Sequence, residues 1–232
     1  ALVTGGDGTE GRSGTRRRAW GGASGSTLVT ITGSGVGLAH AIKSENKAIG
    51  SRIVRIGRGP YLSDDGDDAG ADHVPADIDG AYYLVHSMSS STDYGTLEQR
   101  SAVNFREAMR RTQVKHVVYL SGIVNETALS EHLASRKVVE EELGKGGYHF
   151  TTLRASIIIG SGSASFEIIR DLVEKLPVMI APKWLNTRSQ PIGVADVITF
   201  LTRTLFHEGT YDRSFDIGGP DVWTYEQMMQ EA

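Results

Sequence analysis

The chain has 232 residues, enough to bury one large core, and we expect a single domain over residues 1–232 whose N-terminal third, residues 1–80, is atypical. Its 24 lysines and arginines against 28 aspartates and glutamates give a net charge of −4, which argues against nucleic acid as the main partner, because phosphate binding depends on clustered basic residues. Cysteine is absent, which excludes disulfides and thiolate chemistry, and no signal pattern or membrane-spanning apolar run is present, so we expect a cytoplasmic protein without a membrane span.

Two glycine turns in the N-terminal third each follow a strand-like apolar segment. They are Gly5, Gly8 and Gly11 after residues 1–4, and Gly33, Gly35 and Gly37 after residues 27–32. Glycine lets the backbone turn tightly toward a pyrophosphate, which the N–H groups of a following helix then bind. Residues 12–26 have no apolar face and predict no helix, whereas residues 38–49 predict a short one. We therefore favour the second turn as the phosphate loop and keep the first as the alternative.

A second strand is predicted over residues 51–56, and two arginines lie near its end. An arginine at this place in a dinucleotide-binding unit contacts a 2′-phosphate, whereas an acidic residue there binds a ribose hydroxyl. Arg55 and Arg58 therefore favour NADP as the cofactor over NAD, with Arg58 as the phosphate ligand. The competing interpretation is that Arg58 is a solvated surface charge.

From residue 81 onward, short apolar runs rich in branched and aromatic residues alternate with segments of helical periodicity. The predicted elements are strand 81–86, helix 97–111 after Asp93, strand 116–120, helix 130–143, strand 150–159, helix 166–176, helix 195–206, strand 215–217 and a helix starting at Tyr225. Strands that alternate with helices of this length are joined by right-handed crossovers. The pattern predicts an α/β fold, a doubly wound parallel sheet with helices on both faces.

Five segments of this region together resemble a known family. They are 81–88 (AYYLVHSM), 117–122 (VVYLSG), 132–136 (HLASR), 153–166 (LRASIIIGSGSASF) and 215–221 (FDIGGPD). In combination they resemble the atypical short-chain dehydrogenase/reductase superfamily, specifically the NmrA-like NAD(P)-binding proteins related to the complex I 39 kDa subunit. The resemblance implies a Rossmann-like domain with a small C-terminal subdomain on the substrate side. In that subdomain would lie Trp184, Arg188 and Gln190, and the loop 160–165 would face the nicotinamide or the substrate.

Aligned on the second glycine turn, the family pattern implies a third strand over residues 70–77. Asp77 then occupies the position where the family has an acidic residue near the adenine. Only residues 78–80 remain before the next strand, although a parallel crossover takes a dozen or more residues. The helix expected there is missing, and the register built on the first turn avoids this only by using poor helix sequences.

The resemblance also points to a catalytic site. Active members of the superfamily use a Tyr-x-x-x-Lys pair, in which the lysine lowers the pKa of the phenol, together with a serine or threonine that polarises a carbonyl. At the same i, i+4 spacing this chain has His132 and Arg136, and Ser121 ends the preceding strand. His132 is suited to acid–base chemistry and Arg136 to a ribose or phosphate. Loss of the tyrosine pair together with the activity is the competing interpretation, and no pattern indicates a metal site.

Two functions remain open at this point. One is an NAD(P)-binding oxidoreductase or nucleotide-sugar epimerase-like enzyme that acts on an unidentified small molecule. The other is a non-catalytic dinucleotide sensor or assembly subunit, which the relation to the complex I subunit implies.

Overall fold

The structure is a computed structural model that describes residues 27–32, 52–56, 74–85, 94–123, 131–160 and 183–231, the first two ranges as backbone only. Within these ranges six strands form one sheet in which every neighbouring pair is parallel. In sheet order they are β2 (Arg52–Ile56), β1 (Thr27–Thr32), β3 (Gly80–Leu84), β4 (His116–Gly122), β5 (His149–Ala155) and β9 (Arg213–Ile217).

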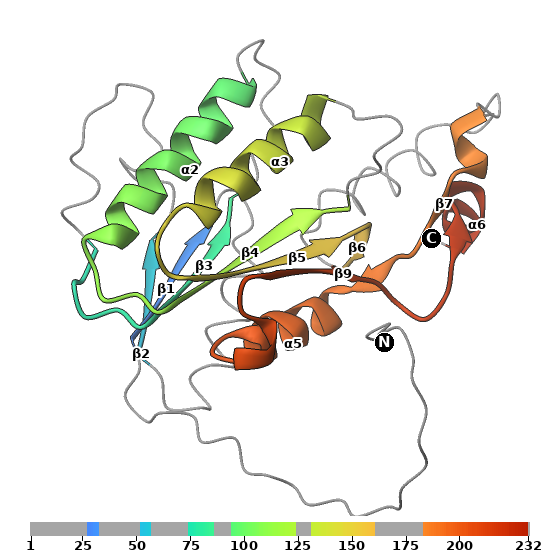
Figure 1. Cartoon of the computed structure of the whole chain (residues 1–232). Helices are drawn as coiled ribbons and strands as arrows, with labels where there is room; N and C mark the ends of the chain where they lie inside the picture. Colours follow the sequence, from blue (N-terminus) through green and yellow to red (C-terminus); the bar gives the residue numbers. More distant parts are fainter. Residues whose placement is uncertain are drawn as a thin grey trace, which may run out of the picture.

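Helices cover both faces of this sheet. Figure 1 shows α2 (Tyr94–Arg110) and α3 (Glu131–Gly144) side by side on one face and α5 (Val194–Thr204) on the other. This arrangement confirms the predicted Rossmann-like doubly wound fold. Within the described ranges, every helix is too short or too polar to span a bilayer.

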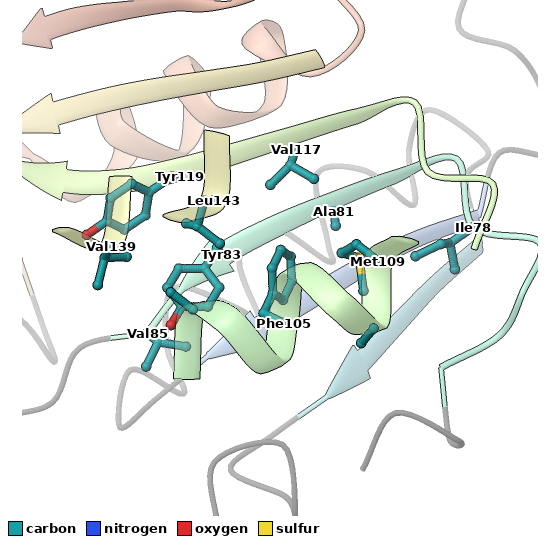
Figure 2. Close-up of a cluster of buried hydrophobic side chains, with 12 residues drawn as sticks. Ile78, Ala81, Tyr83, Val85, Phe105, Met109, Val117, Tyr119, Val139 and Leu143 are labelled. Atoms are coloured by element: carbon teal, nitrogen blue, oxygen red, sulfur yellow. The ribbon is translucent and has the colours of Figure 1, made fainter. Parts of the chain in front are cut away.

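Strand β3 is apolar along its whole length because both of its faces are buried. Ala81 and Tyr83 belong to the core under α2 and α3, and Tyr82 and Leu84 belong to the core that contains α5. Figure 2 shows the first of these cores, where side chains of α2 and α3 meet those of β3 and β4. The Tyr83 ring meets the edge of Phe105, with the ring centroids 4.9 Å apart. Alternating side chains on one strand therefore hold two helical layers together.

The strand predicted over 150–159 is two strands. Strand β5 ends at Ala155, and β6 (Ile158–Ile159) pairs with β8 (Ile192–Gly193) in a separate two-stranded sheet. The chain leaves the main sheet between β5 and β6, because residues 156 and 157 bond to residues 190 and 192 instead of a strand of that sheet. The Ser156 hydroxyl donates to the carbonyl of Gln190, and the Ile192 N–H donates to the carbonyl of Ile157 at 2.9 Å.

The strand predicted over 70–77 is also wrong in its described part, because residues 74–77 form a bend and a turn. Two hydrogen bonds fix this path. The Gln113 N–H donates to the Ala76 carbonyl at 3.0 Å, and the Lys115 N–H donates to the Asp79 carbonyl at 2.8 Å. The backbone before β3 is thus bonded to the loop before β4 rather than to a neighbouring strand.

A small C-terminal subdomain has its own apolar cluster of Ile157, Leu185, Met228 and Met229. Its elements are the short helix η3 (Lys183–Asn186), β7 (Arg188–Ser189), β10 (Trp223–Thr224), which pairs antiparallel with β7, and α6 (Tyr225–Glu231). A second short helix, η4 (Glu208–Thr210), lies between α5 and β9.

Candidate functional site

The order of the strands reverses at β1. Strand β2, the next along the chain, lies on one side of β1, and β3 lies on the other. In open parallel sheets, ligands bind at the carboxyl ends of the strands where such a reversal occurs. Thr32 at the end of β1 pairs in register with Leu84 at the end of β3, so both strands end at this edge. The favoured glycine turn begins with the next residue, Gly33.

Several predicted site residues lie outside the described ranges. They are the glycines of both turns, namely Gly5, Gly8, Gly11, Gly33, Gly35 and Gly37, together with Arg58 and residues 161–165 of the loop after β6. His132 lies in the first turn of α3, one helical turn before Arg136, and the structure describes its backbone only.

Ser121 lies next to the last residue of β4, at the same carboxyl edge. Its side chain is buried, with 3% exposure, and its Oγ has no hydrogen-bond partner among the residues that the structure describes. A buried hydroxyl without a partner is costly, and such groups are found where a ligand supplies the partner.

The Arg136 side chain from α3 lies against the last residue of β4. A Cβ atom added at Gly122 would lie 3.6 Å from both Cδ and Nη1 of Arg136. Across the described ranges, no carboxylate forms an ion pair with this guanidinium. The structure therefore places Ser121 and Arg136 at the same end of β4.

Tyr119 lies two residues before Ser121 on the same strand and faces the same core. Burial raises the pKa of its phenol to about 12, and the nearby Ser121 hydroxyl and Arg136 charge only partly oppose this rise. Ser121 is close enough for that influence but does not meet hydrogen-bond geometry. Tyr119 is thus protonated at neutral pH, and the phenol is not a ready proton acceptor.

The pair Glu98 and Ser135 joins α2 to α3 beneath this edge. The Ser135 hydroxyl donates to Oε2 of Glu98 at 2.6 Å, and both side chains are buried. Sequence reasoning missed this pair, although one signal was present. Glu98 precedes the buried Ala102 by four residues and the buried Phe105 by seven. Residues at this helical spacing share one face, so the Glu98 carboxylate lies on the buried face of α2.

Asp77 does not lie at the carboxyl edge. It precedes β3 by three residues, in the turn hydrogen-bonded to the loop before β4, and so lies at the opposite, amino-terminal edge of the sheet. Its position therefore argues against the contact with an adenine that the family pattern implied.

Gln190 joins the small subdomain to the carboxyl end of β9, because its side-chain amide donates to the carbonyl of Gly219. Arg188 lies exposed in β7, and the side chain of Trp184 is outside the described residues. No group of three histidine, aspartate or glutamate side chains in the described ranges is arranged to hold a metal ion.

Solved structures with this fold include several nicotinamide-binding enzymes. A short-chain dehydrogenase/reductase superfamily protein from Agrobacterium tumefaciens with bound NAD has a TM-score of 0.68 at 12% identity, covering 88% of this chain and 81% of that one. UDP-glucose 4-epimerase from Thermotoga maritima, with UDP-glucose, has a TM-score of 0.66 at 11% identity, covering 88% and 80%. UDP-glucuronic acid 4-epimerase from Bacillus cereus in complex with NAD has a TM-score of 0.66 at 16% identity, covering 87% and 80%.

No family model and no curated protein matches the sequence. At these identities the likeness to the solved structures establishes the Rossmann-like fold, and the function has to be argued from the site itself.

Proposed function

We propose that this chain is an NAD(P)-binding protein of the short-chain dehydrogenase/reductase superfamily, with the dinucleotide lying across the carboxyl ends of β1, β3 and β4. The observation that carries the proposal is the position of β1. It lies at the reversal of strand order and leads directly into Gly33, Gly35 and Gly37. A glycine turn at this place lets the backbone approach a pyrophosphate.

Two residues at this edge fit a nicotinamide dinucleotide. The buried Ser121 hydroxyl lacks a partner among the described residues. The Arg136 side chain lies against the next residue of β4, Gly122, and forms no ion pair within the described ranges. Arg136 would donate to a ribose or phosphate oxygen, and Ser121 would donate to a carbonyl or ribose oxygen. The dinucleotide, when bound, supplies hydride transfer.

The activity that we propose is that of an oxidoreductase or a nucleotide-sugar epimerase-like enzyme. Ser121 polarises the carbonyl of a small-molecule substrate, and His132 exchanges a proton with the substrate at neutral pH. Structural neighbours solved with NAD or with UDP-glucose support this reading. We further propose a preference for NADP through Arg58 and a kinship with the NmrA-like proteins.

A non-catalytic dinucleotide sensor is the second candidate, and one observation favours it. The first turns of α3 offer His132 and Arg136 where the active enzymes have tyrosine and lysine. Arginine stays protonated, and the nearby phenol of Tyr119 has a pKa of about 12, so neither takes the place of the tyrosine as proton acceptor.

Cofactor affinity and turnover separate these possibilities. Arg136→Ala removes a charge-assisted hydrogen bond, so we expect the affinity for NADPH to fall by about tenfold to a hundredfold. The control is Arg203→Ala, which removes an exposed arginine from α5 on the other face of the sheet. Equal affinities of the two variants would contradict the proposed site.

Turnover is measured with NADPH against a panel of carbonyls and quinones, and with NAD and UDP-sugars for epimerisation. The enzyme proposal predicts turnover that Ser121→Ala lowers. Cofactor binding without turnover on any of these substrates would favour the sensor.

A further inference from the structure

A buried histidine holds the amino-terminal edge of the sheet, opposite the proposed cofactor site. His116 is the first residue of β4 and is fully buried. The Phe206 N–H donates to Nδ1 of His116 at 2.9 Å, and Nε2 of His116 lies 2.8 Å from Oγ1 of Thr151. The Thr151 hydroxyl in turn donates to the carbonyl of Thr210 at 2.6 Å. We call these four residues the His116 network.

The network is consistent with one protonation state of the ring. Nδ1 accepts a hydrogen bond from Phe206 and therefore carries no proton. The single proton of the Thr151 hydroxyl is used toward Thr210, so Oγ1 accepts from Nε2, which carries the proton of the neutral imidazole. A second proton on Nδ1 would place two N–H donors against each other and break the bond to Phe206.

The groups around the ring add to this preference. Burial is the main reason why the pKa of His116 is lowered to about 4, and His149 on β5 contributes as a second cause, while Asp212 opposes the shift. The His149 ring stacks on Tyr211 with centroids 4.1 Å apart, and Tyr211 meets the edge of His116 at 4.7 Å.

The Asp212 carboxylate is hydrogen-bonded to His149 and Phe150 rather than to His116. Its two carboxylate oxygens lie 3.0 Å from Nδ1 of His149 and 3.0 Å from the N–H of Phe150. Of the other charged groups at this edge, Lys115 before β4 and Glu208 in η4 act on Tyr211, and Asp79 forms an ion pair with Lys115. The Arg213 guanidinium lies over the Phe215 ring and donates to the Gly209 carbonyl. Among the described residues the two ring nitrogens of His116 face Thr151 and Phe206, so no carboxylate there is in hydrogen-bond contact to stabilise a second proton on the ring.

The network also holds a strained connection. Residues 205–212 link α5 to β9, and both Phe206 (φ 61°) and Asp212 (φ 57°) have left-handed backbone conformations that non-glycine residues seldom adopt. Phe206 is bonded to the ring through its N–H, and Thr210 is bonded to it through Thr151. A proton on Nδ1 breaks the bond to Phe206, whereas Nε2–H can still donate to Thr151, so the connection would relax first at Phe206.

We propose that His116 is a pH-sensitive latch that holds residues 206–212 against the amino-terminal edge of the sheet while its ring is neutral and lets them open from Phe206 when the ring gains a proton. The latch is independent of the proposed cofactor function, since it lies at the opposite edge. Its opening is local and precedes the loss of the two cores.

Nuclear magnetic resonance of the full chain between pH 7.5 and 3.5 tests the latch. We expect the ring nitrogen shifts of His116 to report the Nε2–H tautomer at pH 7. The amide signals of residues 206–212 should then change together with His116, before those of Val117 and Val118 in the core. Titration of His116 near pH 6.5, or no change in residues 206–212 before the core unfolds, would overturn the proposal.

Two variants make the test specific. His116→Asn keeps a side-chain acceptor for the Phe206 N–H but does not titrate, so residues 206–212 should stay in place across this pH range. His207→Asn removes a neighbouring exposed histidine and should leave the transition unchanged. If His116→Asn does not fold, Thr151→Val provides the second test, because it removes the partner of Nε2 and should shift the opening by at least half a pH unit. An opening at the wild-type pH in Thr151→Val would contradict the latch.

Discussion

The Ser135 hydroxyl donates a hydrogen bond to the Glu98 carboxylate at 2.6 Å, within the buried contact between α3 and α2. Removing one partner of a buried charged group costs more than removing an exposed bond, because the carboxylate cannot turn to water. We expect Ser135→Ala to lower the free energy of unfolding by about 1.5–3 kcal/mol, measured by urea titration.

The matched control is Ser214→Ala. The Ser214 hydroxyl also donates to a glutamate, Glu140, at 2.8 Å, but this bond is exposed. Its loss should change the unfolding free energy by less than about 0.5 kcal/mol. Equal losses in the two variants would show that burial of the Glu98 carboxylate does not decide the cost.

Gly219 is predicted to tolerate no side chain. A Cβ atom there would overlap the backbone carbonyl oxygen of Pro191, and backbone cannot move aside as a flexible side chain can. We expect Gly219→Ala to lower the unfolding free energy by about 1–3 kcal/mol. Gly95 in the first turn of α2 has open space around it, so Gly95→Ala should instead stabilise by about 0.5 kcal/mol. Chemical denaturation measures the unfolding free energy of both variants. An unchanged unfolding free energy in Gly219→Ala would contradict the close contact.

His116 makes the global stability depend on pH. The pKa of a histidine in the unfolded chain is about 6.5, whereas that of folded His116 is about 4, so the unfolded state takes up the proton first. The free energy of unfolding that the neutral His116 ring contributes is therefore fully present above pH 6.5. It is lost progressively as the pH falls to 4, by about 3 kcal/mol in total. Urea midpoints of wild type and His116→Asn should converge over this window. Parallel curves would mean that His116 is not the group responsible.

The choice between NADP and NAD is predicted to rest on Arg58. Its guanidinium would bind the 2′-phosphate that only NADP carries, so Arg58→Ala should weaken NADPH by about tenfold and leave NADH nearly unchanged. Dissociation constants for both cofactors check this. An equal effect on the two would remove Arg58 from the phosphate site.

Much of the fold could be predicted from local patterns. Residues 81–85 form a continuous apolar run because β3 is buried between two helical layers, and the helical spacing in 131–144 matches α3 closely. The break after Ala155 could not be predicted, since residues 150–159 are apolar throughout and the partner that draws the chain away lies in 190–193. Such non-local pairing leaves no mark on the local sequence.

The candidate site was predicted in part. Ser121 and Arg136 lie at the same end of β4, because one is near the carboxyl end of the strand and the other is in the first turns of the helix that follows it. Asp77 was assigned by alignment alone, and the turn before β3 puts it at the other edge. Glu98 was missed because a carboxylate in a polar helix is normally solvated, and its burial depends on Ser135 in a helix 37 residues further on.

Calorimetric titration of the full chain with NADPH and NADH tests the central claim most directly. The account predicts saturable binding of a dinucleotide, weakened about tenfold or more by Arg136→Ala and unaffected by Arg203→Ala. The absence of both binding heat and thermal stabilisation with either cofactor would contradict it.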